Sequence, residues 1–336
     1  MRVAIVGATG AVGQELLDLL AQRAFEPSEL RLYASPRSAG RTMTFQSEDV
    51  RVEPLPDGGE LGADVVFSSA GGSLSKARAR DWARHASVVI DNTSAWRMDP
   101  TTPLVVPEVN AAAARAHEGV VANPNCSTII ALMALAPLHR AFGLTRATVA
   151  TYQAVSGTGA KGIDELTRMS RAALEGRDEA PEAFQHDIAF NLFSHDSEVG
   201  EDGYNVEERK LLLEARKILA APDLAISATC VRVPVYRAHS EAIHAEFARP
   251  VTPEEARAAL AASAGVRIVD DRDANRFPMP RDAAGRNEVL VGRIRADASR
   301  AGAVALFVSG DQLRKGAALN AVQIAETLRA DGLLPA

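Results

Sequence analysis

Residues 2–20 read RVAIVGATGAVGQELLDLL, which is a short β-branched run, a glycine-rich turn and an amphipathic segment. Arg2 to Val6 predicts a strand, and the leucines that follow the turn recur at helical spacing. Glycines in such a turn permit a close backbone approach, and the N–H groups that begin the helix can bind a pyrophosphate. The stretch predicts a dinucleotide-binding βα unit; the alternative is a tight turn that binds nothing. Candidate contacts are Gly7, Thr9, Gly10, Ala11, Val12 and Gly13.

The next predicted strand, residues 30–34, leads into a loop with hydroxyl groups and a guanidinium. NAD-specific domains usually place Asp or Glu here to hold the ribose 2′-hydroxyl, and a carboxylate would repel the 2′-phosphate of NADP. Arginine pairs well with phosphate. The loop predicts NADP as the cofactor, held by Ser35, Arg37 and Ser38; the alternative is a solvated basic loop.

Strands and helices continue to alternate through residues 63–68, 75–84, 87–91 and 104–106. Such a series predicts a doubly wound, mostly parallel sheet, in which ligands bind beyond the carboxyl ends of the strands. Arg97 follows one of these ends and is a candidate anion-binding residue, although an isolated arginine is more often a surface residue.

Residues 119–131, GVVANPNCSTIIA, contain a strand, a turn at Asn123 to Asn125 and the start of an apolar helix. The turn puts Cys126 in the first turn of that helix, where unpaired N–H groups and the helix dipole favour a thiolate. Cys126 is therefore a candidate nucleophile, and the alternative is a small buried residue.

The second half of the chain contains several further candidates. A strand at 147–155 carries Gln153 and ends in a glycine-rich turn with Ser156 and Gly157, which lacks the ending of a P-loop. Residues 175–203 are irregular and are expected to cover a subunit interface. A helix at 205–219 puts Glu207 and Lys210 on one face, where a solvated ion pair is the usual outcome.

Residues 240–247 alternate at period two and predict a strand with His244 and Glu246 on its more polar face. A histidine on that face, in a chain with a candidate thiolate, is a candidate acid/base, although a strand histidine is more often structural. Arg237 lies in the turn before this strand, and Cys230 is expected in the core.

The chain has 336 residues, 47% of them hydrophobic and 24% charged, which is enough for two globular domains. Its net charge of -6 argues against nucleic acid or an anionic membrane as a partner. Two cysteines are too few for a disulfide framework or a four-cysteine zinc site. Because we find no signal peptide or transmembrane run, we expect a cytoplasmic protein without metal.

Seven motifs together resemble the aspartate-β-semialdehyde dehydrogenase family, and they span nearly the whole chain. They are GATGAVG at 7–13, NTSAWRMD at 92–99, NPNCST at 123–128, TYQAVSGTGAKG at 151–162, EERK at 207–210, RVPVYRAHSEAIH at 232–244 and DQLRKGAALNAVQIAE at 311–326. The resemblance implies an α/β fold with a Rossmann-like NADP-binding domain (1–125), a catalytic and dimerisation domain with a mixed sheet (126–313), and a C-terminal helix (314–336) that returns to the first domain.

The resemblance also implies NADPH-dependent reduction of L-aspartyl-4-phosphate to L-aspartate-4-semialdehyde by a homodimer, in lysine, threonine, methionine and diaminopimelate synthesis. In the family pattern Cys126 forms the acyl thioester, Gln153 orients it and His244 is the general acid/base. The pattern assigns the substrate's carboxylate and amino ends to Arg237 and Glu207, its phosphate to Arg97 and Lys210, and NADP contacts to the 10–13 turn, Arg37, Ser38, Ser156, Gly157 and Asn320.

Three other functions remain open. N-acetyl-γ-glutamyl-phosphate reductase shares the fold and the thioester chemistry, but its cysteine usually follows glycine, whereas Asn125 precedes Cys126. A non-catalytic NADP-binding homologue would be expected to lose the cysteine or the histidine. A short-chain reductase would need Tyr-x-x-x-Lys, and Tyr152 is followed four residues later by Ser156.

Overall fold

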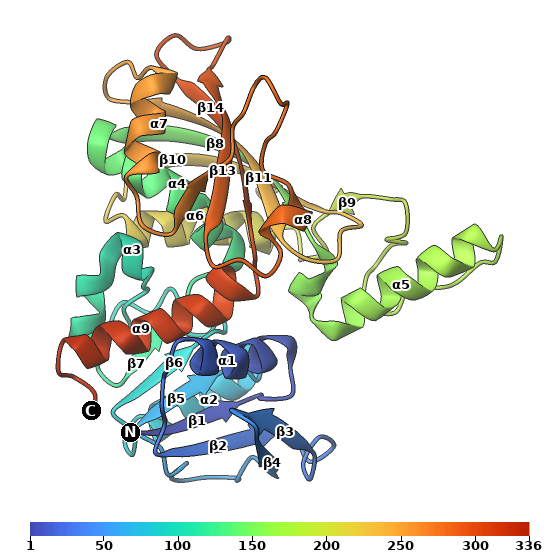
Figure 1. Ribbon diagram of the computed structural model, residues 1–336, viewed down its shortest axis with the longest axis vertical. Coiled ribbons are helices and arrows are strands. Elements are labelled where there is room, and N and C mark those ends of the chain that lie inside the picture. The colour runs from blue at the N-terminus through green and yellow to red at the C-terminus, as the bar shows by residue number, and fades with distance from the viewer. Residues whose placement is uncertain (336) are drawn as a thin grey trace. The chain divides into compact units, whose positions relative to one another are not determined.

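The computed structural model describes residues 1–335, which form two compact units. Unit 1 comprises residues 1–125 together with the segment that begins at Ala317, and unit 2 comprises Cys126–Gly316 (Figure 1). Each unit has its own seven-stranded sheet.

Unit 1 is built on a sheet with the strand order β3-β4-β2-β1-β5-β6-β7. The strands are β1 (Arg2–Val6), β2 (Glu29–Ala34), β3 (Thr42–Phe45), β4 (Glu48–Pro54), β5 (Val65–Ser68), β6 (Val88–Asp91) and β7 (Val120–Ala122). All neighbouring pairs are parallel except β3 and β4. The strands of the central sheet are apolar on both faces because helices cover both. This confirms the predicted doubly wound sheet.

Helices α1 (Ala11–Gln22) and α9 (Leu319–Ala330) pack on one face of this sheet, and α2 (Gly72–Trp82) packs on the other (Figure 1). The short helix α3 (Pro107–Asn110) and the 3₁₀ helix η1 (Ala111–Ala116) precede β7. The C-terminal helix thus returns to the first sheet, as predicted. Two details differ from the predictions. The hairpin β3–β4 was not predicted, and of residues 104–106 only Leu104 forms an isolated bridge, to Ala122.

Unit 2 contains a mixed sheet with the order β12-β13-β14-β11-β8-β10-β9. Its strands are β8 (Leu144–Gln153), β9 (Phe193–Ser194), β10 (Ala225–Arg232), β11 (His239–Phe247), β12 (Val266–Ile268), β13 (Val289–Ala296) and β14 (Val304–Gly310). β8 and β10 run parallel, whereas β11 is antiparallel to both β8 and β14. Because β11 runs against β8, its first residue lies next to the last residue of β8.

One face of the second sheet is covered by α4 (Cys126–Phe142), α6 (Val206–Ile218) and α7 (Pro253–Ala261). Helix α4 is buried from Ser127 to Leu138, so it forms the centre of this core. The opposite face keeps side chains partly exposed, among them Tyr152 and His244.

The remaining elements of unit 2 lie around the sheet. They are α5 (Ala160–Leu174), which projects from the sheet edge in Figure 1, α8 (Pro280–Ala283), the 3₁₀ helix η2 (Val155–Thr158) and the π-helix η3 (Arg314–Ala318). Within residues 1–335 no helix is both long and apolar enough to cross a membrane.

Candidate active site

The first βα turn has the geometry of a dinucleotide-binding turn. Gly7 has a φ of +87°, and its N–H donates to the carbonyl of Tyr33 at 2.8 Å. A Cβ on Gly13 would stand 2.4 Å from the carbonyl oxygens of Gly7 and Ala8, so only glycine lets α1 pack this closely. The first turn of α1 has no capping side chain, which leaves its N–H groups for an anion. These features fit a nicotinamide dinucleotide.

The loop after β2 carries no carboxylate between Ser35 and Arg41. Ser35 and Arg37 are exposed there, and Ser38 is half-buried, its N–H donating to the carbonyl of Ser35 at 2.8 Å. The loop is therefore open to solvent and compatible with a 2′-phosphate.

Arg97 is a buried residue at the carboxyl edge of the first sheet, and not a surface residue. Its Nε donates to the carbonyl of Asn123 and its Nη2 to that of Asn92, both at 3.0 Å. Asn320, at the start of α9, donates to the carbonyl of Val105 at 2.9 Å and to Asn123 Oδ1 at 2.6 Å. These bonds hold both side chains in one orientation.

In unit 2, Cys126 is the first residue of α4 and is half-buried. A Cβ on Gly316 would stand 3.0 Å from Cys126 Cβ and 3.3 Å from Gln312 Cβ, so Gly316 lies against both. Gln312 in turn accepts from the N–H of Ala238 at 2.8 Å and donates to Ser156 Oγ. These contacts connect the start of α4 with the end of β8 and the start of β11.

The last residue of β8, Gln153, is held on both ends of its amide. Thr151 Oγ1 donates to Gln153 Oε1 at 3.1 Å, and Gln153 Nε2 donates to Glu207 Oε1 at 3.2 Å. Glu207 Oε2 accepts from Lys210 Nζ at 3.0 Å, so the predicted i,i+3 contact on α6 is formed. Glu207 is 5% exposed, which makes this a nearly buried carboxylate next to a cation.

His244 is not part of the group of side chains around Gln153. It lies five residues into β11, opposite Thr148 and Ala305, on the face away from Gln153. Its side chain is 47% exposed, and its Nδ1 contacts Asp297 Oδ2 at 2.6 Å, a hydrogen bond that lowers the pKa of Asp297. The predicted period-two alternation is present in β11, but its polar face is the exposed face of the single chain.

The histidine beside Gln153 is His239, which begins β11 and is fully buried. Its Nδ1 accepts from the N–H of Ala154 at 3.0 Å, so a neutral ring carries its proton on Nε2. Burial lowers the pKa of His239 to about 3, which keeps the ring neutral at neutral pH.

Arg237, predicted to bind substrate, is instead held by Asp311, whose Oδ2 accepts from Arg237 Nε at 2.7 Å and from the N–H of Gly285 at 2.6 Å. The arginine next to Gln153 in the sheet is Arg232, whose side chain is 4% exposed. Its Nη1 donates to the carbonyl of Ala154 at 2.9 Å.

Arg232 and His239 meet at Gly157. A Cβ on Gly157 would stand 3.2 Å from Arg232 Nη1 and 3.3 Å from His239 Cε1. Arg232 Nε and His239 Nε2 are both buried and lack a hydrogen-bond partner among residues 1–335. Because buried polar atoms are normally paired, two such atoms beside a glycine indicate a place for a polar ligand.

Sequence reasoning therefore missed Arg232, His239 and Gln312. A signal was present, because Arg232 stands in an apolar strand, and an arginine there must be paired or bind a ligand.

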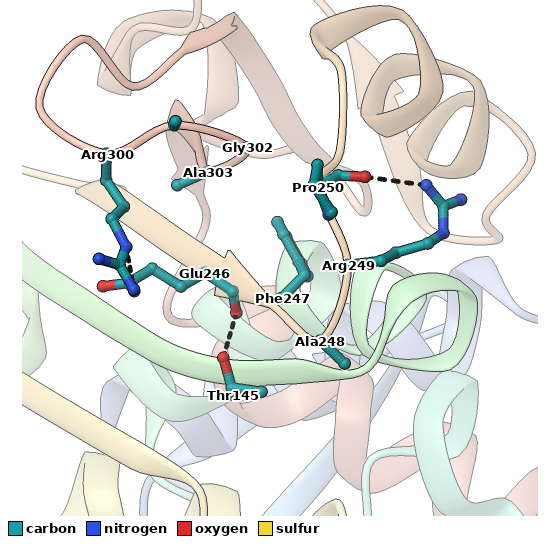
Figure 2. A pocket seen from close by; sticks show the side chains of 10 residues that line it. Thr145, Glu246, Phe247, Ala248, Arg249, Pro250, Arg300, Gly302 and Ala303 are labelled. Carbon is teal, nitrogen blue, oxygen red and sulfur yellow. Dashed lines mark hydrogen bonds and ion pairs between the residues drawn. The ribbon is translucent and has the colours of Figure 1, made fainter.

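The hollow in Figure 2 is separate from this group. It has a volume of about 240 Å³ and is lined by Glu246, Phe247 and Arg300, among others. Arg300 pairs with Glu246 at 2.9 Å, and Thr145 Oγ1 donates to the Glu246 carbonyl at 3.1 Å. Glu246 and Phe247 end β11, about 25 Å along the strand from its first residue. The lining of this hollow contains neither cysteine nor histidine.

Both parts of the chain match known families. Residues 2–117 match the family model described as the NAD-binding domain of semialdehyde dehydrogenase, and residues 135–315 match the one described as its dimerisation domain. Aspartate-semialdehyde dehydrogenase of Synechocystis sp. is 52% identical over 334 residues, which cover 99% of both chains. That of Aquifex aeolicus is 49% identical over 338 residues, again 99% of both.

A solved structure agrees. The crystal structure of aspartate semialdehyde dehydrogenase II from Vibrio cholerae matches with a TM-score of 0.95 and 44% identity over 98% of each chain. The same enzyme is also known complexed with ASA, at 43% identity over 98% of each chain and a TM-score of 0.95. The chain therefore binds a nicotinamide cofactor, carries a dimerisation domain and belongs to the aspartate-semialdehyde dehydrogenase family.

Proposed function

We propose that the chain reduces L-aspartyl-4-phosphate to L-aspartate-4-semialdehyde with NADPH and releases phosphate, as a step of lysine, threonine, methionine and diaminopimelate synthesis. The observation that carries this proposal is the pair of unpartnered buried atoms, Arg232 Nε and His239 Nε2, in the unit whose first helix starts with Cys126. The names of the relatives support the same substrate, and one relative is complexed with ASA.

The charges around Gln153 suit an α-amino acid. Arg232 offers a fixed guanidinium for the α-carboxylate, and Glu207 offers a nearly buried carboxylate for the α-ammonium group. Arg232 thus replaces Arg237 as the proposed carboxylate ligand, because Arg232 Nε is buried without a partner among residues 1–335, whereas Arg237 Nε donates to Asp311.

Cys126 is the proposed nucleophile. Its place at the start of α4 stabilises negative charge on sulfur through the helix dipole. The thiolate attacks the acyl carbon of the substrate, a C–S bond forms, and the C–O bond to phosphate breaks. NADPH, when bound, supplies hydride to the thioester carbon. The thiohemiacetal on Cys126 then releases the aldehyde as the C–S bond breaks. Gln153, held at both ends of its amide, can orient the thioester.

His239 replaces His244 as the proposed histidine at the reacting carbonyl. With Nδ1 occupied by the Ala154 N–H, Nε2–H is the group that can donate to the thioester oxygen as negative charge develops there. The ring keeps its proton: the oxyanion formed by hydride addition accepts this hydrogen bond and collapses directly to the aldehyde and the Cys126 thiolate.

Arg97 and Lys210 remain the proposed phosphate ligands, because both are cations fixed by hydrogen bonds, Arg97 to two backbone carbonyls and Lys210 to the Glu207 carboxylate. We keep NADP as the proposed cofactor, contacted by the Gly7–Gly13 turn, Ser35, Arg37, Ser38, Ser156, Gly157 and Asn320. The exposed Arg37 and the lack of a carboxylate after β2 support the 2′-phosphate, and the related structure from Candida albicans, 26% identical with a TM-score of 0.75 over 99% of each chain, contains NADP.

We also propose a cytoplasmic homodimer. The matched dimerisation domain supports self-association, and the two cysteines, neither of which forms a disulfide, fit a reducing compartment. Light scattering should give twice the chain mass of 35.6 kDa.

The test is NADP reduction by the purified chain with aspartate semialdehyde and phosphate. N-acetylglutamate semialdehyde and NAD serve as alternative substrate and cofactor. We expect phosphate-dependent turnover with aspartate semialdehyde and NADP. Turnover with the acetylated aldehyde alone would assign the reaction to the related reductase, and no turnover with either would refute the proposed reaction.

A further inference from the structure

The irregular segment between α5 and α6 contributes a strand beside Arg232. Its residues Phe193 and Ser194 form β9, which pairs antiparallel with Arg232 and Val231 of β10. The next N–H, of His195, donates to the carbonyl of Cys230 at 2.9 Å. This pairing brings the side chains that follow β9 to the guanidinium of Arg232.

Two of those side chains contact Arg232 Nη2. His195 Nε2 lies 3.0 Å from it and Asp196 Oδ1 lies 3.2 Å from it. A guanidinium only donates hydrogen bonds, so His195 Nε2 can bond Arg232 only as the acceptor of a neutral ring with its proton on Nδ1. The N–H of Ser197 lies 3.2 Å from Nδ1 and would be accepted there only in the other neutral tautomer, so the two donors compete for the ring. Arg232 is thereby held by an acceptor and a carboxylate in addition to the carbonyl of Ala154.

The same segment reaches the start of α6. His195 Nδ1 lies 3.2 Å from Ser197 Oγ, to which its proton can be donated. Ser197 Oγ also accepts from the N–H of Glu207 at 3.2 Å. With the proton on Nδ1, a continuous chain of hydrogen bonds runs from Arg232 through His195 and Ser197 to the backbone of Glu207.

We propose that His195 is a positioning residue, which in its neutral form holds Arg232 in place for the substrate carboxylate and sets its position relative to Glu207. The inference rests on the proposed role of Arg232. It assigns to the irregular segment a function in substrate binding, beyond the interface expected from the sequence.

The charges around His195 determine its pH behaviour. It is faced by Arg232 of β10, by Glu207 and Lys210 of α6, by the adjacent Asp196 and by His239 of β11. Burial lowers the pKa of His195 below its usual value, and Arg232 and Lys210 act in the same direction, against Glu207 and Asp196. As the pH falls through this lowered pKa, the ring gains a proton, can no longer accept from Arg232 and repels it.

The test compares His195→Gln, His195→Leu and the control His186→Gln. Glutamine supplies an acceptor close to the position of Nε2 and does not titrate, whereas leucine supplies none. His186 belongs to the same segment and contacts Phe193 by its ring, 5.4 Å between centroids, so it controls for a general effect of altering this segment. For each variant, kcat and KM for aspartate semialdehyde are measured between about pH 5 and pH 8.

In the wild type we expect KM to rise toward acid pH while kcat at saturation changes little. His195→Leu should raise KM about ten- to a hundredfold at neutral pH, the usual worth of one hydrogen bond to a charged group. His195→Gln should keep the neutral-pH KM and lose the acid rise, and His186→Gln should behave as the wild type.

A His195→Leu variant with the wild-type KM, or a His195→Gln variant with the wild-type acid rise, would refute the inference while leaving the proposed reaction intact. If the wild type shows no turnover at all, the proposed reaction fails. NMR of labelled histidine then still tests the positioning role: the inference requires His195 to be neutral with its proton on Nδ1, and a proton on Nε2 would refute it.

Discussion

Glu241 provides a stability prediction with a defined sign. It lies in β11 opposite Thr151 and Val308, is fully buried, and neither of its oxygens has a partner within residues 1–335. Burial raises the pKa of Glu241 well above 4.5, so the folded chain keeps this carboxyl protonated where the unfolded chain ionises. A folded state that holds one more proton loses stability as the pH rises.

The predicted size of this loss follows from one proton. Between the unfolded pKa and the raised folded pKa, the free energy of unfolding falls by about 1.4 kcal/mol per pH unit. Glu241→Gln removes the titration and keeps the shape. The stability of the variant relative to the wild type should therefore be greater at pH 7 than at about pH 5, growing by about 1.4 kcal/mol for each pH unit up to the raised folded pKa.

Urea unfolding of both proteins at these two pH values measures the difference. Glu208→Gln is the matched control, because Glu208 is also buried but accepts from the N–H groups of Asn205 at 2.9 Å and Cys230 at 3.0 Å. An amide can accept at only one of these positions, so Glu208→Gln should destabilise. If the gain of Glu241→Gln were the same at both pH values, the carboxyl would not be protonated in the fold, and the reasoning would be refuted.

Three further changes test other parts of the structure. Asp270→Ala removes the acceptor of two backbone N–H groups at the irregularity in β13, those of Arg293 at 2.8 Å and Ile294 at 3.2 Å. The free energy of unfolding should fall by about 3 kcal/mol or more in thermal unfolding, and an unchanged melting curve would contradict this role. Gly157→Ala would place a methyl group 3.2 Å from Arg232 Nη1 and 3.3 Å from His239 Cε1. The KM for aspartate semialdehyde should therefore rise about tenfold or more, and an unaltered KM would mean that the substrate does not bind beside Gly157. Arg37→Glu should raise KM for NADP about tenfold or more and leave KM for NAD nearly unchanged, whereas equal effects on both would exclude Arg37 from 2′-phosphate binding.

The first unit could be predicted from the sequence because its signals are local. A strand, three glycines and a helix follow each other directly, and the rest of the sheet repeats the same βα pattern. The hairpin β3–β4 was missed because its residues are mostly polar and its faces are exposed, so the hydrophobic pattern is weak.

In the second unit the helices and strands could be predicted from the sequence, but which strands lie next to each other could not. The alternation in β11 correctly separates Ile243 from His244, yet it does not tell which end of the strand lies beside Gln153. That depends on β11 running antiparallel to β8, a long-range pairing that brings His239, the first residue of β11, beside Gln153, and leaves His244 on the solvent face. Likewise, Arg237 and Arg232 cannot be ranked until Asp311 and Ala154 appear as their partners.

The irregular segment before α6 could be predicted least well from the sequence. Its strand β9 has only two residues, and neither the strand nor the three polar side chains that follow it show a periodic pattern. Its contact with Arg232 arises entirely from the pairing of β9 with β10.

The most direct test of this account compares His239→Asn with His244→Asn in phosphate-dependent NADP reduction with aspartate semialdehyde. Asparagine can still accept from the Ala154 N–H, so His239→Asn removes little more than the Nε2 group that faces the proposed substrate. We predict a loss of kcat of about 10²- to 10⁴-fold for His239→Asn and a nearly unchanged kcat for His244→Asn. A full-rate His239→Asn enzyme, or a loss confined to His244→Asn, would contradict the placement of the catalytic centre at the start of β11.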